Sequence, residues 1–405
     1  MIKAIKVQLK PNNVQSTRLF QCAGTARWAY NWALGKQMEN QKLGLNFLSD
    51  QDLRKELTQL KKTEEYAWLN EVSAQIPKQA VKDLCKAYKK FVFTKNKRYS
   101  KKTLMKAART GKQLGTYDLE EHPKFKSKRF SKPSFYHDDW KIKFTETHAQ
   151  IEKLGLVRLI EHGRIPVDSK YTNPRISHDG LKWWISVGIE VLSPQSLVPI
   201  SEPIGIDLGV KTLAVVSDGQ KFKGKNKGSA IKKSTKKLKR LQRKASRQYE
   251  KIKNKEIERK GRNLLKLEQQ ILKVQQRITN VRTDYLHQVT AELVKTKPEY
   301  VVMEDLNIRG MMKNRHLSKS IQNQKLREFR RMMEYKSASA NIPVIIADRW
   351  FPSSKICSEC GHEKEDLKLS DRTYHCNNCG TEIDRDLNAA INLREYGRKE
   401  LSKVS

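Results

Sequence analysis

Residues 203–219 read PIGIDLGVKTLAVVSDG, and this stretch decides the fold of the second half of the chain. Apolar, mostly β-branched residues surround Asp207, so the pattern predicts buried strands at 203–209 and 212–217, followed by a short strand at KFKG. A glycine two positions away on each side of the acid permits another backbone to approach closely. A carboxylate in a buried strand is costly unless a cation accompanies it. Asp207 is therefore a candidate functional residue.

Two further carboxylates stand in similar settings far along the chain. Glu304 ends the apolar run of PEYVVMEDLN, which predicts a strand at 299–304. Asp386 lies in IDRDLNAAINL, just before a helix expected at 387–400. Two-metal phosphodiester cleavage needs hard oxygen ligands, because one Mg²⁺ activates the attacking water and the other stabilises the leaving oxygen. The three acids are therefore candidate ligands of two catalytic Mg²⁺ ions.

Neighbouring acids leave one assignment open. Asp305 adjoins Glu304, but strand alternation points it to the opposite face. Asp384 competes with Asp386, which we prefer because the first turn of the expected helix would present its carboxylate; the choice between these two stays open. A lone buried Asp more often caps a turn, so the argument rests on the set of three. No Ser-His-Asp or Cys-His arrangement competes with it.

Cysteine spacing gives the most specific motif. Each of two CxxC pairs aims two thiolates at one ion, and a glycine follows each pair, as tight knuckles require. This arrangement predicts one structural Zn²⁺ with no open position and hence no catalysis, rather than a redox centre. Its ligands are Cys357, Cys360, Cys376 and Cys379. The remaining Cys22 and Cys85 fall in helical patterns and are expected to be buried core thiols.

The charge of the chain indicates its partner. Lys and Arg number 82 against 44 acidic residues, a formal charge of +38 over 405 residues, which favours a nucleic acid. The interval 221–262 alone holds 19 basic residues and 3 Glu, and we interpret it as a phosphate-facing surface rather than a solvated helix face. No apolar run predicts a membrane span and no secretory signal is evident. The cysteine usage fits a reducing compartment with a metal site rather than a disulfide framework.

The first half combines helices with short strands. A strand at 2–9 precedes a helical unit. Within 121–195, the alternating runs WKIKFTE, HAQIEKL, LVRLIEH and LKWWISVGIEVL predict an antiparallel sheet or barrel, which the first strand would join. We expect helices from Ser16 and at 48–61 and 78–93, a mobile basic loop at 95–112 and a linker at 193–202. The first and third of these helices carry apolar stripes, which include Leu34 and Leu84. In the second half we expect a helical stretch at 231–295, a helix at 318–337 and a strand at 342–348. Apolar residues from Leu264 to Tyr285 repeat at alternating steps of three and four, which predicts a coiled-coil-like seam or a core-facing stripe. The basic, aromatic run 123–135 and the pair Trp183-Trp184 are weaker candidates for base stacking, with core packing at least as favoured for each Trp.

Four of these segments together resemble one family. GIDLGVKTLAVVSDG, VVMEDLNIRGM, FPSSKICSECG and YHCNNCGTEIDRDLNAAINL look like TnpB, the transposon-encoded RNA-guided DNA endonucleases ancestral to type V CRISPR effectors. PNNVQSTRLFQCAGTARWAYNWAL and PKFKSKRFSKPSF extend the likeness to nearly the whole chain. The resemblance implies an α/β multidomain fold. Its expected parts are a wedge-type β-barrel (1–10 and 121–195), an inserted helical recognition lobe (11–120), a RuvC, ribonuclease-H-like nuclease domain (196–352 and 382–405) and a zinc-binding insertion for target nucleic acid (353–381).

The resemblance also implies an activity. It makes Asp207, Glu304 and Asp386 the nuclease acids of a Mg²⁺-dependent enzyme that cuts double-stranded target DNA beside a short transposon-adjacent motif. A noncoding RNA from the transposon end would be the guide, so that base pairing reads the sequence. All three acids are present, which argues against a guided repressor without cleavage; a guide-independent transposase or resolvase is the other alternative. The expected location is the prokaryotic cytoplasm, on the nucleoid when DNA is bound, and the oligomeric state stays open.

Overall fold

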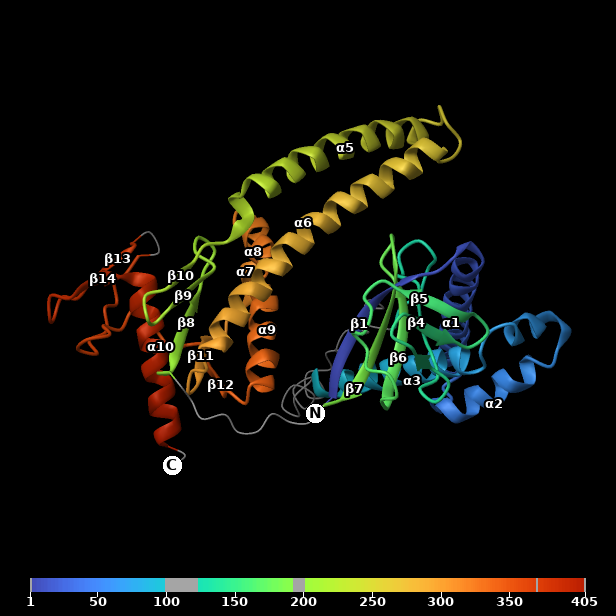
Figure 1. Cartoon of the computed structure of the whole chain (residues 1–405), viewed down its shortest axis with the longest axis horizontal. Coiled ribbons are helices and arrows are strands. Elements are labelled where there is room, and N and C mark those ends of the chain that lie inside the picture. The colour runs from blue at the N-terminus through green and yellow to red at the C-terminus, as the bar shows by residue number, and fades with distance from the viewer. Residues whose placement is uncertain (1, 99–122, 192–200, 369–370, 404–405) are drawn as a thin grey trace, which may run out of the picture. The chain divides into compact units, whose positions relative to one another are not determined.

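The computed structural model describes residues 2–98, 123–191, 201–368 and 371–403. The chain divides into two compact units, Met1–Leu192 and Ser193–Ser405, which are described separately (Figure 1). The expected loop at 95–112 lies outside the described residues from 99 onward, and the expected linker lies outside them up to residue 200. No helix among the described residues is long and apolar enough to cross a membrane.

The first unit is built on a seven-stranded antiparallel sheet. Its strand order is β2-β6-β7-β1-β5-β4-β3. The strands are β1 (Ile2–Lys10), β2 (Ser134–Tyr136), β3 (Lys143–Phe144), β4 (His148–Ile151), β5 (Gly155–Leu159), β6 (Tyr171–His178) and β7 (Trp183–Glu190). The N-terminal strand pairs with β7 from Ile2 opposite Glu190 to Leu9 opposite Trp183, and with β5 on its other side. The first strand therefore joins the sheet, as its alternating pattern predicted.

Strand β6 was not among the strands that the sequence pattern predicted. Pro174 lies inside it and has no backbone N–H to donate, which normally argues against a strand. The structure accommodates the proline with a register shift between Thr172 and Arg175, where Asn173 adopts a φ of 48°. An irregularity of this kind inserts extra residues without ending the pairing, so composition alone conceals the strand.

Helices fill the chain between β1 and β2. They are α1 (Asn13–Lys42), α2 (Asp50–Leu60), the 3₁₀ helix η1 (Glu64–Asn70) and α3 (Gln75–Arg98). Helix α1 begins earlier than the expected cap at Ser16, because Asn12 and Gln15 form a reciprocal capping box. The stripes predicted on α1 and α3, including Leu34 and Leu84, are buried in one core with the sheet. Cys22 and Cys85 lie in this core, as expected.

The second unit is built on a five-stranded mixed sheet of order β10-β9-β8-β11-β12. The strands are β8 (Ile204–Leu208), β9 (Ala214–Val216), β10 (Lys221–Phe222), β11 (Val301–Glu304) and β12 (Val344–Ala347). The first three form an antiparallel meander, whereas β11 is parallel to both β8 and β12. The connecting helices are α5 (Ser229–Lys253), α6 (Arg262–Lys295), α7 (Ile308–Met311), α8 (Ser318–Gln324) and α9 (Leu326–Ser339), and the last helix is α10 (Arg385–Ser402).

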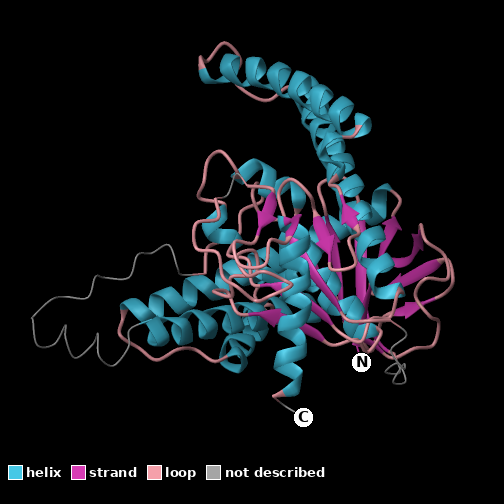
Figure 2. Cartoon of the chain, turned by 90° about the vertical axis from the view of Figure 1, so that its left-hand side faces the viewer, coloured by secondary structure: helices cyan, strands magenta, loops and turns pink. Residues whose placement is uncertain are grey.

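Two stretches expected as single helices are each broken in two. The stretch 231–295 is a hairpin of α5 and α6, which lie side by side in both views (Figures 1 and 2). Its turn contains Lys255 at a φ of 61°, and a similar left-handed residue, Lys325 at 55°, separates α8 from α9. A helix cannot continue through this conformation. The periodic stripe on α6 packs against α5 around Val274 and Ile278, which confirms the predicted seam.

Helices cover both faces of the mixed sheet. Alternate residues of β8 and β11, such as Ile206 and Met303, pack against α6 and α9. The opposite face carries Val302, which packs with Leu393 of α10. Because strand side chains alternate between faces, Asp207 and Glu304 lie on the face that α10 covers. The hairpin of β13 (Thr373–His375) and β14 (Glu382–Asp384) leads directly into α10.

Candidate active site and metal-binding cysteines

Parallel pairing brings the first two acids together. Ile206 of β8 is paired with Met303 of β11, so the next residues along the two strands are Asp207 and Glu304. Both carboxylates therefore lie at the carboxyl end of neighbouring central strands, on the same face. This edge is where open α/β sheets commonly hold ligands.

Helix α10 brings the third acid to this edge. A Cβ on Gly205 would lie only 2.0 Å from the carbonyl oxygen of Ala390, so the helix backbone packs directly on the strand. Asp386 lies about one turn before Ala390, and Gly205 lies two residues before Asp207. The glycine therefore permits the approach that carries Asp386 toward Asp207. This agrees with the close backbone approach that the sequence predicted around Asp207.

The electrostatics of the three acids indicate a cation site. Burial raises the pKa of Asp207 well above its usual range, and the carboxylates of Glu304 and Asp386 raise it further. Burial also raises the pKa of Glu304, although a hydrogen bond from Ser353 and the charge of Arg385 oppose this. The two carboxylates repel each other, and we attribute the resulting rise in pKa mainly to Asp207. A divalent cation would relieve the repulsion and hold all three groups ionised, so the donor set fits Mg²⁺.

The carboxylates converge without forming a single tight ligand cage. Within the described ranges, the four cysteines are the only set of three or more ligand side chains whose atoms all lie within 4.8 Å of one another. Asp207, Glu304 and Asp386 form no such set. Ionised carboxylates repel one another, and ligands shared between two ions need not all contact the same one. The geometry thus brings the acids to one edge of the sheet and leaves their separation wider than for the thiols.

Asp384 has a different environment from Asp386. Its side chain caps α10 by accepting hydrogen bonds from the backbone of Asp386 and Leu387, and it forms an ion pair with Lys221 at 2.8 Å. Burial works against its ionisation, but these partners outweigh burial and lower its pKa. Asp384 is thus occupied as a helix cap, whereas Asp386 raises the pKa of Asp207 more than Asp384 does.

The sequence analysis missed the residues that support the site. Ser353 Oγ donates a hydrogen bond of 2.5 Å to Glu304. Asn392 of α10 donates to the carbonyl oxygens of Ser353 and Ile356, and Asn388 binds Ile356 and the N–H of Ser358. Asn388 and Asn392 are four residues apart and share one helix face. Two asparagines at this spacing on an expected helix were the sequence signal that could have predicted its hydrogen bonds to the loop at Ser353 and Ile356.

The four cysteines form the site that their spacing predicted. Cys357 and Cys379 sulfurs are 3.7 Å apart, and Cys360 and Cys376 sulfurs are 3.5 Å apart. Zn–S bonds of about 2.3 Å in a tetrahedron imply sulfur separations of about 3.8 Å, so the four thiols fit one zinc ion. All four are free thiols rather than disulfides.

Two matching knuckles carry these thiols. The N–H of Gly361 donates to the carbonyl of Cys357, and that of Gly380 donates to the carbonyl of Cys376. Both glycines adopt positive φ angles, 75° and 73°, which only glycine adopts without strain. Fully buried Tyr374 packs beneath the thiols. Hydrogen bonds from Thr381 lower the pKa of Cys379 to about 6, which favours the thiolate that binds metal.

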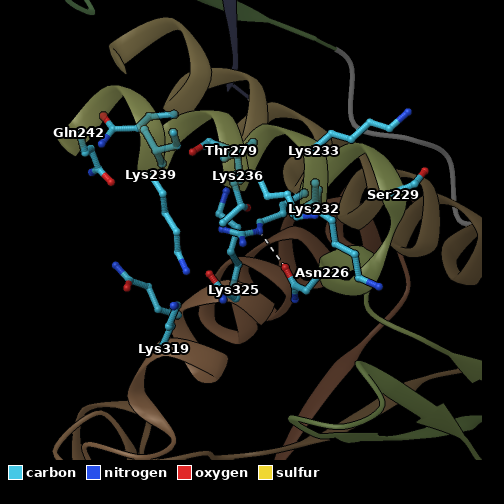
Figure 3. Close-up of a pocket in the computed structure, with 18 residues that line it drawn as sticks. Asn226, Ser229, Lys232, Lys233, Lys236, Lys239, Gln242, Thr279, Lys319 and Lys325 are labelled. Carbon is cyan, nitrogen blue, oxygen red and sulfur yellow. Dashed lines mark hydrogen bonds between the residues drawn. The ribbon is translucent and has the colours of Figure 1, made fainter. Parts of the chain in front are cut away.

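A basic groove lies along α5, α6 and α8, and none of the three acids lines it (Figure 3). It has a volume of about 1100 Å³, and none of its lining residues is acidic. Its cations are Lys232, Lys233, Lys236, Lys239, Arg282, Lys319 and Lys325. Burial lowers the pKa of both Lys325 and Arg282, and Arg282 donates to Asn226 at 2.8 Å. A groove with this charge fits a polyanion.

The weaker aromatic candidates separate into packed and exposed residues. Trp183 is buried in the core of the first unit, whereas Trp184 points away and lies under Lys6, whose Nζ is 4.9 Å from the ring centroid. This division agrees with strand alternation. In the basic run 123–135, Phe135 is buried but Phe130 is 81% exposed. Only Phe130 and the half-exposed Phe125 stay available for stacking.

Comparison with known families assigns most of the chain. Models described as "Probable transposase" and "Cas12f1-like, TNB domain" match residues 186–315 and 327–393. A model described as "Helix-turn-helix domain" matches residues 1–44. In the structure the described part of that segment is β1 followed by the single helix α1, which is not a helix-turn-helix.

Two relatives match nearly the full length. One from Streptomyces pristinaespiralis, named "Putative RNA-guided DNA endonuclease", is 29% identical over 98% of this chain and 89% of its own length. Another from Escherichia coli K12, with the same description and the name InsQ, is 28% identical over 99% and 94%. A solved mini-RNA-guided endonuclease, CRISPR-Cas_phi3, is similar in fold, with a TM-score of 0.50, 11% identity and coverage of 98% and 92%.

Fold and sites together define an α/β protein with an acidic sheet edge and a cluster of four cysteines that could hold a metal ion. The family models and the full-length relatives specify this class further. The chain resembles the TnpB family over nearly its whole length, which confirms the resemblance that its motifs predicted.

Proposed function

We propose that the protein is an RNA-guided, Mg²⁺-dependent endonuclease that cuts double-stranded target DNA beside a transposon-adjacent motif. The observation that carries this proposal is the convergence of Asp207, Glu304 and Asp386 at one edge of the mixed sheet. The names of the full-length relatives support the same activity. A guide RNA transcribed from the transposon end would supply the sequence recognition.

The mixed sheet supports a RuvC-type, ribonuclease-H-like nuclease domain. Its antiparallel meander followed by two parallel strands agrees with the hairpins that the sequence predicted after the acidic strand. We propose that this domain comprises 196–352 and 382–405, with 353–381 as its zinc-binding insertion. In the first unit, we propose 1–10 and 121–195 as the wedge domain and 11–120 as the helical recognition lobe.

The chemistry follows from the donor set. Bound Mg²⁺ ions would supply an activated water and charge stabilisation for the leaving oxygen. Asp207, Glu304 and Asp386 would hold these ions, and Ser353 would orient the Glu304 carboxylate through its hydrogen bond. Zinc on the four cysteines would stabilise the insertion without catalysis, because four thiolates fill its coordination sphere.

Guide RNA and target DNA are the proposed partners. The acid-free groove along α5, α6 and α8 suits a phosphate backbone, and the formal charge of +38 suits a large polyanion. We expect the protein to act on nucleoid DNA in a prokaryotic cytoplasm, where thiolates stay reduced.

Purification and cleavage test this proposal. The purified protein should carry an RNA of defined sequence and should cut DNA that matches the guide segment of that RNA. Cutting should disappear with EDTA and with Asp207→Ala, while guided binding persists. RNA-independent cutting would instead identify a guide-independent transposase or resolvase, and guided binding of wild type without cutting in Mg²⁺ would identify a repressor.

A further inference from the structure

A cavity of about 510 Å³ opens beside Glu304 and is lined by five arginines. No lysine lines it, although lysines dominate the large basic groove. The arginines come from three places that are distant along the chain: the start of α7, helix α9 and the loop after β12. They are Arg309, Arg327, Arg330, Arg331 and Arg349. Arginine presents a planar fork of donors that matches a phosphate, whereas lysine acts as a point charge.

Asp305 organises two of these arginines. It accepts a hydrogen bond from Arg330 at 2.8 Å with one carboxylate oxygen and from Arg349 with the other. Both contacts lower the pKa of Asp305. Strand alternation turns Asp305 away from the three acids, as the sequence predicted, and toward α9. One carboxylate thus fixes two guanidinium groups beside the carboxyl end of β11.

The held arginines keep donors free. A guanidinium has five N–H groups, and the described contacts use two from Arg330, to Asp305 and Glu334, and one from Arg349. Among the described residues, Arg309 and Arg327 form no ion pair, and both are exposed. The cavity therefore combines two oriented guanidinium groups with two further cations that lack an acidic partner in the described chain.

We propose that this cavity holds a backbone phosphate of the DNA strand being cut, adjacent to the scissile one, and that Asp305 is the positioning residue. The inference rests on the proposed nuclease function and adds a substrate subsite to it. DNA is favoured over the guide RNA because Glu304, a proposed catalytic ligand, lines the same cavity. Oriented arginines would fix the DNA strand so that the next phosphodiester lies at the three acids. Such contacts away from the reacting bond lower the entropic cost of orienting the substrate.

A cycle that combines single methylphosphonate linkages in the DNA with arginine variants of the protein tests the subsite. A methylphosphonate removes one phosphate charge, and substrates would carry it at successive linkages around the cut position mapped with wild type. In the RNA-loaded protein, one linkage should slow wild-type cutting by about 10-fold or more, the scale of 1.4 kcal/mol. The same linkage should cause little further slowing in Arg330→Gln/Arg349→Gln. Full additivity of the two effects at every linkage would overturn the inference.

Matched variants distinguish phosphate binding by these arginines from a purely structural role of the same residues. Arg398→Gln removes an arginine that pairs with Glu202 and Glu395 near the opposite end of the strands, so it should leave the methylphosphonate profile of wild type unchanged. If the double variant fails to fold, Arg309→Gln/Arg327→Gln serves in its place, because no ion pair within the described residues depends on these two side chains. Asp305→Asn should raise KM for target DNA and weaken the methylphosphonate effect. Failure of wild type to cut at all would instead count against the proposed function.

Discussion

Gly205 and Ala390 are in direct backbone contact, since a Cβ on Gly205 would lie 2.0 Å from the carbonyl oxygen of Ala390. It would also lie 2.6 Å from the backbone nitrogen of Arg394. This contact fixes α10 on β8 about one turn after Asp386, which lies in the first turn of the helix. The third acid therefore depends on a residue that carries no side chain. The same helix holds the loop of Ser353 through its two asparagines, so one contact supports two parts of the site.

Gly205→Ala should abolish cutting. The added methyl group must displace α10, because both of its nearest neighbours are backbone atoms. Overpacking of this kind costs about 1–3 kcal/mol, and a shift of about 1 Å in the site costs about 100-fold in rate. Single-turnover cleavage and thermal melting measure the two effects. Gly24→Ala, in the interior of α1 with nothing within 4 Å, is the control and should keep full activity.

Asp386→Asn and Asp384→Asn should differ sharply. Asp386→Asn removes a proposed metal ligand and should reduce cutting by about 100-fold or more, the upper end of the effect of removing a supporting ligand. Asp384→Asn should be nearly neutral, because Asn caps helices as well as Asp and the exposed pair with Lys221 is worth about 0–1 kcal/mol. Cleavage rates of the two variants under saturating Mg²⁺ show which acid binds the metal. The reverse order of effects would make Asp384 the third acid.

Asp207→Asn should stabilise the metal-free protein while it abolishes cutting. Folding buries Asp207 beside Glu304 and Asp386, and this raises the pKa of Asp207. At neutral pH the ionised form of Asp207 therefore opposes folding. Stability in EDTA should therefore rise as the pH falls through this elevated pKa, and the variant should lose that dependence.

Melting in EDTA and in Mg²⁺ measures this difference. Removing the repulsion should raise the melting temperature, by about 2–4 °C for each kcal/mol that is relieved. Mg²⁺ should stabilise wild type more than the variant. Equal melting temperatures in EDTA, with equal responses to Mg²⁺, would contradict a cation site at Asp207.

Cys376→Ser should release the zinc ion and unfold the insertion. Structural zinc contributes about 10–16 kcal/mol of binding energy in small domains, so three thiolates should not hold the hairpin at β13 and β14. Zinc content by elemental analysis and proteolysis of the C-terminal region provide the measurements. Cys22→Ser, which removes a core thiol in the other unit, should keep the zinc. Unchanged zinc content in Cys376→Ser would refute the four-thiolate site.

Lysines of one helix should differ in their effect on nucleic-acid binding. Lys232, Lys236 and Lys239 line the groove, so replacing all three with Gln should reduce the salt slope of binding by about 0.7–0.9 for each phosphate that is no longer neutralised. The control set on the same helix, which does not line the groove, is Lys237, Arg240 and Lys244. Binding titrations of guide RNA over a range of salt concentrations measure the slope. Equal slopes for the two triple variants would show that the groove does not face phosphate.

The sequence by itself determined the chemistry and most of the elements. The four-cysteine site, the acidic strand ends and the stripe that pairs α5 with α6 depend on spacing and periodicity, which are local properties. The irregular turns at Lys255 and Lys325 were not predicted, because a left-handed lysine has no compositional signature. Pro174 concealed β6 for a related reason, since tertiary pairing retained a residue that normally ends a strand.

Only the tertiary structure decided which residues meet. Parallel pairing set Asp207 beside Glu304, and backbone packing at Gly205 brought Asp386 to the same edge, whereas Asp384 became a helix cap. Strand alternation predicted which face of the sheet Asp305 occupies. It did not predict that Arg330 and Arg349 would lie on the same face and donate to Asp305. Periodicity records the direction of a side chain relative to its own element. Its partners come from elements tens to hundreds of residues away, and packing selects them.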